Sequence, residues 1–228
     1  MRPFSDDDQV QANAGSATFV TSQALTVPAG TSEGNNGIIV AGVQLPIISP
    51  AQWHPTVALP SGLLQVLCRA DLPAGESSWT LAAVTNCNWA WTAAEWANGS
   101  SAPVEATTTA TGTTGLSSLS TGTTATFTTQ YVMGIAAFLM TSSGGAAWPS
   151  FSYDNSFTET DSQQSGDGTA NGDLLLKVTR RYGTDSEAGP WSCTATFTGS
   201  TATKIPFAAL VVFRAGDTAD PPLPVTTS

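Results

Sequence analysis

Apolar and polar residues alternate in several stretches of the chain, and threonine fills many of the polar positions. Residues 124–128 put Ala125 and Phe127 on one face of an extended segment and three threonines on the other. Residues 192–198 repeat the pattern with Phe197 on the apolar face. Successive side chains of a β-strand point to opposite faces, so both stretches predict strands with one face in a core. Threonine is β-branched and favours this extended backbone without adding charge.

Eleven strand-like runs are predicted, and turn sequences such as Pro-Ala-Gly and Asn-Gly separate them. They cover residues 17–27, 37–44, 63–70, 79–84, 88–96, 123–129, 131–140, 148–159, 172–180, 191–198 and 205–214. Residues 107–122 fit either a flexible loop or a paired outer strand with weak register. Many strands without a helical pattern predict an all-β protein, which we expect to be a single two-sheet antiparallel β-sandwich of the jelly-roll type.

We expect one domain with an arm at each end, since 228 residues suit a single large all-β unit. Residues 1–15 are polar and acidic and are expected to form an N-terminal arm. Residues 217–228 are rich in proline and are expected to form a C-terminal arm, because proline cannot join a central strand. Residues 16–216 would form the sandwich. The N-terminus lacks the apolar segment of a signal peptide, so we expect synthesis and retention in a cytoplasm until release.

Charged residues make up only 11% of the chain, well below the ~25% typical of soluble proteins. The 7 basic residues against 17 acidic residues give a formal net charge of −10, and only Arg180 and Arg181 are adjacent basic residues. Phosphate neutralisation requires clustered basic side chains, so a nucleic-acid partner is not expected. No run approaches the ~20 apolar residues of a membrane-spanning helix, so no membrane span is expected either.

The cysteine and histidine content argues against metal and nucleophilic chemistry. Cys68, Cys87 and Cys193 lie in apolar or alternating runs, which favours free buried thiols, with one disulfide as the alternative. There is no Cys-x-x-Cys spacing, and His54 is the only histidine, so an ordinary zinc site is not expected. A catalytic triad needs a base beside its nucleophile, and His54 is better explained as a surface or packed residue.

The acidic residues allow two further hypotheses, and solvated loop carboxylates are the simpler interpretation of both. Two carboxyl groups at a defined separation could hydrolyse a glycosidic bond, for which the candidates are Glu95, Glu159 and Asp161. A calcium site could use oxygen ligands from Asp154, Asn155, Glu159, Asp161, Asp167 and Asp173. Their spacing matches no calcium-binding loop. We therefore predict no enzyme activity, no catalytic residue, no metal and no cofactor.

Four of the seven tryptophans fall within residues 79–96. Exposed aromatic rings can stack on sugars, so the candidate glycan or interface contacts are Trp89, Trp91 and Trp96. Trp89 and Trp91 share one face of their predicted strand, and this arrangement favours a core or a subunit interface over a sugar platform.

Short motifs along the chain resemble those of phage minor tail proteins and related virion proteins. Residues 24–31 (ALTVPAGT) and 37–41 (GIIVA) resemble the family's strand and turn "tVPaGT" followed by a "GDllvv" strand. Residues 73–81 (PAGESSWTL) and 88–99 resemble its next glycine turn and strand. The resemblance covers about residues 16–216 and implies a jelly-roll or concanavalin-like sandwich.

The resemblance also implies a structural function. The chain would be a bacteriophage virion protein, a minor tail or baseplate component that acts by assembly and display. Its partners would be other virion subunits, including copies of itself, with a homotrimer as the working hypothesis. It would be made in the host cytoplasm and located in the virion tail. The alternatives are a capsid decoration protein and a carbohydrate-binding module at the tail tip that contacts a host-surface glycan.

Overall fold

The computed structural model of the chain describes residues 4–26, 30–44, 47–48, 53–58, 62–97, 99–127, 131–184 and 188–216. After a short 3-10 helix, Asp6–Asp8, every regular element in these residues is a strand. The first half contains β1 (Gln9–Thr26), β2 (Asn36–Val43), β3 (Ile47–Ile48), β4 (His54–Ala58), β5 (Leu64–Arg69) and β6 (Ser78–Trp96). The second half contains β7 (Gly99–Thr111), β8 (Ser118–Ser120), β9 (Val132–Ser143), β10 (Ser150–Tyr153), β11 (Thr158–Ser165), β12 (Asn171–Tyr182), β13 (Thr194–Thr198) and β14 (Lys204–Ala215).

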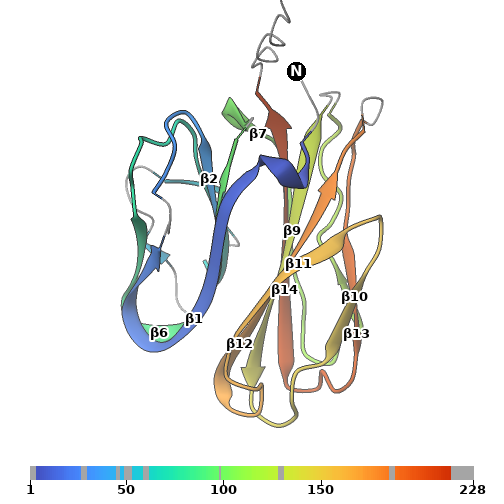
Figure 1. The fold of residues 1–228 in the computed structure, drawn as a ribbon. Helices are drawn as coiled ribbons and strands as arrows, with labels where there is room; N and C mark the ends of the chain where they lie inside the picture. The colour runs from blue at the N-terminus through green and yellow to red at the C-terminus, as the bar shows by residue number, and fades with distance from the viewer. Residues whose placement is uncertain are drawn as a thin grey trace, which may run out of the picture.

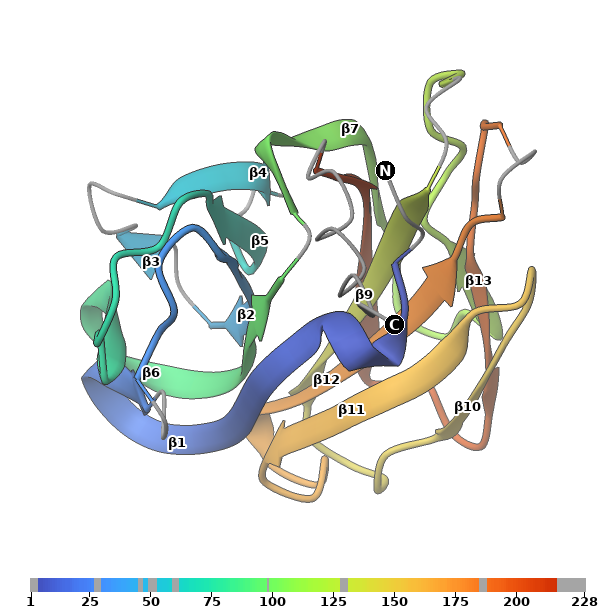
Figure 2. The same cartoon turned by 45° about the horizontal axis from the view of Figure 1, so that its top comes forward.

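These strands form three antiparallel sheets (Figures 1 and 2). Sheet A has the order β1-β6-β2-β5-β4, with β3 paired to β6, and sheet B has the order β11-β12-β9-β14-β7. Sheet C has the order β10-β13-β8. Sheets A and B pack against each other around a shared core, so the predicted all-β antiparallel sandwich is confirmed. Sheet C covers the other face of sheet B and adds a layer that the sequence did not predict.

The sheets divide the chain by sequence. Every strand of sheet A precedes residue 97, and every strand of sheets B and C follows it. The chain therefore passes between sheets A and B once, at the short link from β6 to β7. In a jelly roll, consecutive strands alternate between the two facing sheets. Here this happens only in the second half of the chain, which moves back and forth between sheets B and C.

Sheet A is strongly curled. Strands β1 and β6 pair over almost their whole lengths, and register shifts between Ala17 and Ser22 mark bulges in this ribbon. Bulges bend a strand and increase its twist, and Figure 1 shows β1 and β6 folded together into a U. The concave side of the U encloses a core of its own: Ile39, Ala41, Val43, Trp53, Leu67, Leu72, Trp79, Leu81, Ala83, Cys87, Trp89, Trp91 and Ala93. The predicted strands 79–84 and 88–96 are thus one bent strand.

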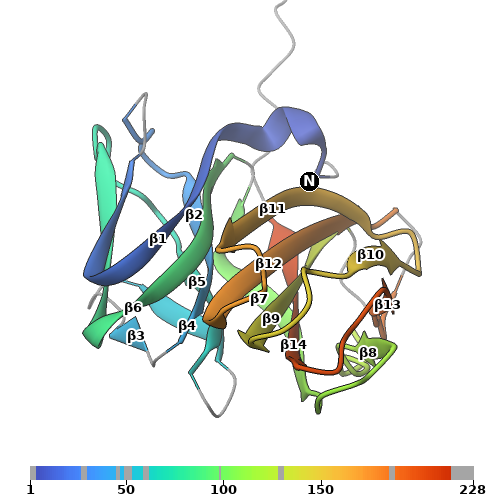
Figure 3. The ribbon, with the colours of Figure 1, turned by 90° about the horizontal axis from the view of Figure 1, so that it is seen from below.

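The opposite face of sheet A packs on sheet B, and Figure 3 shows the two sheets side by side with β11 and β12 next to β6. Side chains of β2, β5 and β6 meet those of β9, β12 and β14 in this core, including Ile38, Val40, Val66, Trp96, Ile135, Leu139, Leu176, Val178, Val211 and Phe213. Strands β2 and β9 are buried on both faces because each lies in the middle of its sheet and is covered on either side.

The two threonine-rich patterns had different outcomes. In residues 192–198, Cys193, Ala195 and Phe197 are buried and Thr196 is exposed, so the predicted alternation is confirmed in β13. The strand predicted over residues 123–129 is wrong for its described part, residues 123–127, which is irregular. Thr124 is buried there because its backbone and hydroxyl form two hydrogen bonds with the backbone of Trp191, and these replace a strand ladder.

A segment expected outside the sheets, and one for which a loop and an outer strand were both open, belong to the sheets. Residues 9–15 form the start of β1 and pair with β6, and Phe4 packs against Trp96, so the N-terminal arm predicted over residues 1–15 is wrong for these residues. Of residues 107–122, the first five complete β7, which pairs with β14 as an outer strand. The predicted C-terminal arm, residues 217–228, lies outside the described residues.

A buried lysine fixes the start of β14 to two loops. The side chain of Lys204 is fully buried, and its ammonium donates hydrogen bonds to Ser142 Oγ (2.8 Å), to the Ala146 carbonyl (2.7 Å) and to the Gly168 carbonyl. Burial lowers the pKa of the Lys204 ammonium, although Asp173 and Asp167 act in the opposite direction. The loops that follow β9 and β11 are thereby held against the same charged group.

The three cysteines are free and buried, as predicted. Cys68 lies in the core between sheets A and B, Cys87 inside the curl of sheet A, and Cys193 in the core between sheets B and C. Burial raises the pKa of the Cys68 thiol from 9.0 to about 12. Burial, with a smaller contribution from Asp154, raises the pKa of the Cys193 thiol to about 12 as well.

Because of these two buried thiols, we expect the protein to lose stability in alkaline solution. Between pH 9 and pH 12 the folded chain retains protons on Cys68 and Cys193 that the unfolded chain releases, so the free energy of unfolding falls as pH rises. Inside this window each thiol lowers the free energy of unfolding by about 1.4 kcal/mol per pH unit, and below pH 9 it has no effect. Urea unfolding from pH 7 to pH 11 measures the slope, and the Cys68→Ala, Cys193→Ala double variant should show a shallower one. An unchanged slope in the double variant would contradict the assignment.

Candidate functional site

The tryptophans proposed as glycan or interface contacts are core residues of the chain. Trp89 and Trp91 are 0% and 4% exposed and point into the curl of sheet A, as their shared face predicted. Trp96 is 1% exposed and lies on the other side of β6, between sheets A and B. None of the three presents a ring face to solvent on which a sugar could stack. Core packing, the alternative favoured by the sequence, accounts for all three.

Glu95, a candidate for glycoside hydrolysis, is fully buried in a hydrogen-bonded network. Its Oε1 accepts hydrogen bonds from the Ser32 amide and from Asn35 Nδ2, both at 2.7 Å. Its Oε2 accepts a hydrogen bond from Gln11 Nε2. The carboxyl group therefore ties β1 and the segment before β2 to β6. It holds strands together and has no access to a substrate.

The other acidic candidates are engaged in local structure. Glu159 accepts hydrogen bonds from Tyr153 and Lys177, and Asp173 accepts them from the backbone amides of Gly168 and Ala170. Among the described residues no group of three or more histidine, cysteine or acidic side chains could hold a metal ion. His54 opens β4, but its side chain lies outside the described part of the structure.

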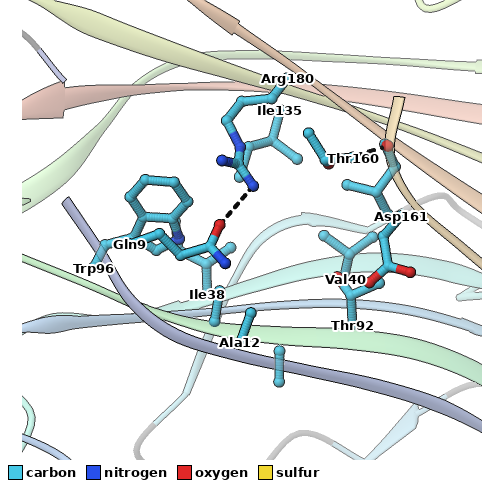
Figure 4. Close-up of a pocket in the computed structure, with 13 residues that line it drawn as sticks. Gln9, Ala12, Ile38, Val40, Thr92, Trp96, Ile135, Thr160, Asp161 and Arg180 are labelled. Carbon is cyan, nitrogen blue, oxygen red and sulfur yellow. Dashed lines mark hydrogen bonds between the residues drawn. The ribbon is translucent and has the colours of Figure 1, made fainter. Parts of the chain in front are cut away.

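A cleft opens where the edges of sheets A and B meet, between β1 and β6 on one side and β11 and β12 on the other (Figure 4). It encloses about 70 Å³. Its floor is apolar and its polar groups come from both sheets; the lining includes Gln9, Thr92, Trp96, Thr160, Asp161 and Arg180. In Figure 4 Trp96, Gln9 and Arg180 lie on one side of the cleft, and Asp161 and Thr92 lie on the other.

Arg180 links the N-terminal segment to sheet B at this cleft. Its Nη2 donates to Gln9 Oε1 (2.7 Å), and its Nη1 donates to Asp6 Oδ1 and to the Tyr182 hydroxyl (both 3.0 Å). The guanidinium also lies over the Trp96 ring, 4.6 Å from its centroid. One face of the indole is therefore covered by a cation, which is a favourable contact for both groups.

A wider outer pocket of about 260 Å³ adjoins the cleft and shares Thr160 and Arg180 with it. Hydroxyl groups from alternate positions along β11 and the preceding turn line it, together with Tyr182. Burial raises the pKa of the Tyr182 phenol to about 12, with opposing contributions from Arg180, which lowers it, and Asp6, which raises it. The phenol is therefore protonated at neutral pH and donates a hydrogen bond to Asp6 Oδ1 (2.7 Å).

Asp161 was named from the sequence only as a candidate for glycoside hydrolysis or calcium binding, and Arg180 was not named as a site residue. On β12 the residues Leu174, Leu176 and Val178 form an apolar row toward sheet A, and Arg180 continues that row at the next inward position. A charged residue that ends an inward-facing row is a usable signal for a polar site at a sheet edge. Its partners Asp6 and Gln9 could not be found this way, because they lie 174 and 171 residues away.

No helix within the described ranges has the length and apolar character that crossing a membrane would require. Comparisons of the chain with protein-family models, with curated proteins and with solved structures found no match.

Proposed function

We propose that this chain is a bacteriophage virion protein, a minor tail or baseplate component that works by assembly and display and is not an enzyme. The sequence motifs that resemble phage minor tail proteins support the virion assignment. The engagement of Glu95, Lys204 and Arg180 in holding strands and loops together supports a structural function, because these buried or half-buried charges are used for rigidity.

The observation that carries the assembly proposal is strand β7. It is 13 residues long and forms the end of sheet B, where β14 is its one hydrogen-bonded neighbour among the described strands. Its only charged residue is Glu105, which lies 3.8 Å from Arg214. A long edge strand with few charges is a template for pairing with another chain, and strand addition is a common mode of subunit contact.

A lysine on β7 should therefore prevent assembly. Ala106 and Ala110 pack toward sheet C, so Thr109 faces the other side of the strand. We expect the purified wild-type protein to have three times the mass of the 23.4 kDa chain by light scattering, and the Thr109→Lys variant to have the mass of one chain. The matched control is Thr196→Lys, an exposed threonine on β13, which has strands on both sides.

Each outcome decides a separate part of the proposal. A wild-type monomer would overturn self-assembly, and an oligomeric Thr109→Lys variant would exclude β7 as the contact. The virion assignment has its own test, which is mass spectrometry of purified particles of the phage that encodes the chain. Absence of the chain from the tail fraction would overturn the tail assignment.

A further inference from the structure

The cleft between sheets A and B contains a buried hydrogen-bond donor without an acceptor. Trp96 is 1% exposed and lines the cleft, and its Nε1 has no hydrogen-bond partner within the described part of the chain. Figure 4 shows this nitrogen on the side of the ring that faces the other lining residues. Leaving a buried N–H unpaired is costly, so an oxygen atom that enters the cleft would gain a hydrogen bond there.

Two further polar groups point to the same kind of ligand. Gln9 accepts a hydrogen bond from Arg180 through Oε1, which leaves its amide nitrogen to donate. Asp161 uses Oδ1 to accept from the Ser162 amide (2.7 Å) and from Gln163 Nε2 (2.9 Å), which leaves Oδ2 to accept. A ligand group that both accepts and donates fits this set, and a hydroxyl group does both.

The charges around the two cavities favour a neutral ligand. Arg180 is paired with Asp6 at 3.0 Å, and Asp161 and Arg181 add one charge of each sign. The guanidinium of Arg181 lies over the Trp191 ring, 4.4 Å from its centroid. A phosphate, a carboxylate or an ammonium group would find no excess of opposite charge here.

The volumes of the two cavities indicate which part of a ligand each can hold. The inner cleft, about 70 Å³, has the volume of roughly two or three water molecules, which suits a hydroxyl or hydroxymethyl group and not a sugar ring. The outer pocket, about 260 Å³, is larger and is lined by Ser156, Thr158, Thr160 and Tyr182. Thr160 and Arg180 line both cavities, so the two cavities are neighbours.

We propose that this cleft and its outer pocket bind the terminal sugar of a neutral glycan. The pyranose ring occupies the outer pocket against Tyr182, and one hydroxyl or hydroxymethyl group enters the cleft. That group accepts a hydrogen bond from Trp96 Nε1, and Asp161 Oδ2, on the opposite side of the cleft, accepts a hydrogen bond from a neighbouring hydroxyl group of the same sugar. Trp96 acts as a hydrogen-bond donor and does not stack on the sugar, since Arg180 covers its ring. The inference does not depend on the assembly proposal.

Indole signals in ¹H–¹⁵N correlation spectra of the full-length protein test the inference. The protein is titrated with the methyl glycosides of glucose, galactose, mannose and N-acetylglucosamine, and the Trp96 signal is assigned by its loss in the Trp96→Phe variant. We expect one of these sugars to shift the Trp96 signal in a saturable manner. Trp91 also has a buried, unpartnered indole nitrogen but lies inside the curl of sheet A, away from both cavities, so its signal should not move.

Variants of two aspartates provide the matched control. Asp161→Asn preserves the shape of the side chain but weakens the acceptor, so the dissociation constant of the sugar should rise about tenfold. Asp167→Asn changes an exposed aspartate in the loop after β11 and should leave the dissociation constant of the sugar unchanged. Absence of a saturable Trp96 shift with every sugar would overturn the proposal. A shift caused by the peptide Ala-Thr-Thr-Thr-Ala with acetylated and amidated termini, which is uncharged, and not by sugars, would overturn it in favour of a peptide ligand.

Discussion

Replacing Glu95 by alanine should destabilise the chain by about 3–5 kcal/mol, which is among the largest effects expected of any single substitution here. The substitution removes a fully buried carboxyl group that accepts three hydrogen bonds, from Gln11, Ser32 and Asn35, and of these donors only Gln11 keeps another acceptor, the Gly30 carbonyl. A buried donor without an acceptor costs about 1–3 kcal/mol. Urea unfolding at neutral pH measures the difference in the free energy of unfolding.

Two further variants make this test specific. Glu95→Gln retains one oxygen that can accept from Ser32 and Asn35, so it should cost less than the alanine substitution. Glu159→Ala removes a carboxyl group that is 33% exposed and bonded to Lys177, and such pairs contribute below about 1 kcal/mol. Equal effects of Glu95→Ala and Glu159→Ala would show that the Glu95 network does not stabilise the fold.

Phe197→Ala should cost about 3–5 kcal/mol. Phe197 is 5% exposed in the core between sheets B and C, and its ring meets that of Phe151 edge-on at 4.9 Å between centroids. Removing the ring leaves a cavity in addition to the lost burial of apolar surface. Thermal and urea unfolding should both report the loss.

The neighbouring residue is the control for Phe197. Thr196 points to solvent from the same strand, so Thr196→Ala should change stability by no more than about 0.5 kcal/mol. A cost below about 1 kcal/mol for Phe197→Ala would mean that sheet C does not pack on sheet B as described. It would also remove the physical basis for the alternation in β13.

The sequence predicted the strands whose burial leaves a regular pattern, either alternation, as in β13, or a continuous apolar run. Strands β2, β5, β9 and β14 appear as apolar runs, because strands covered on both faces need apolar residues at nearly every position. The failure at residues 123–127 has a physical cause. There the hydroxyl of Thr124 bonds to the backbone of a distant segment, and the same residue pattern therefore occurs without a strand.

The candidate site was less predictable than the fold. The cleft depends on Arg180 meeting Asp6 and on Trp96 facing sheet B, and neither relation follows from local periodicity. The curl of sheet A depends on bulges near Val20, which shift register without any turn sequence to mark them. Burial of Trp89 and Trp91 was correctly favoured, because residues two positions apart on a strand point to the same face.

The single passage of the chain from sheet A to sheets B and C has a consequence for folding during synthesis. All strands of sheet A leave the ribosome before any strand of the second half, so each half can close its own short loops first. Until the second half arrives, the face of sheet A formed by residues such as Ile38, Val40 and Val66 has nothing to cover it. Docking of the two halves is then the step that removes this exposed apolar surface, and any delay before it is the period in which the nascent chain is most prone to aggregate.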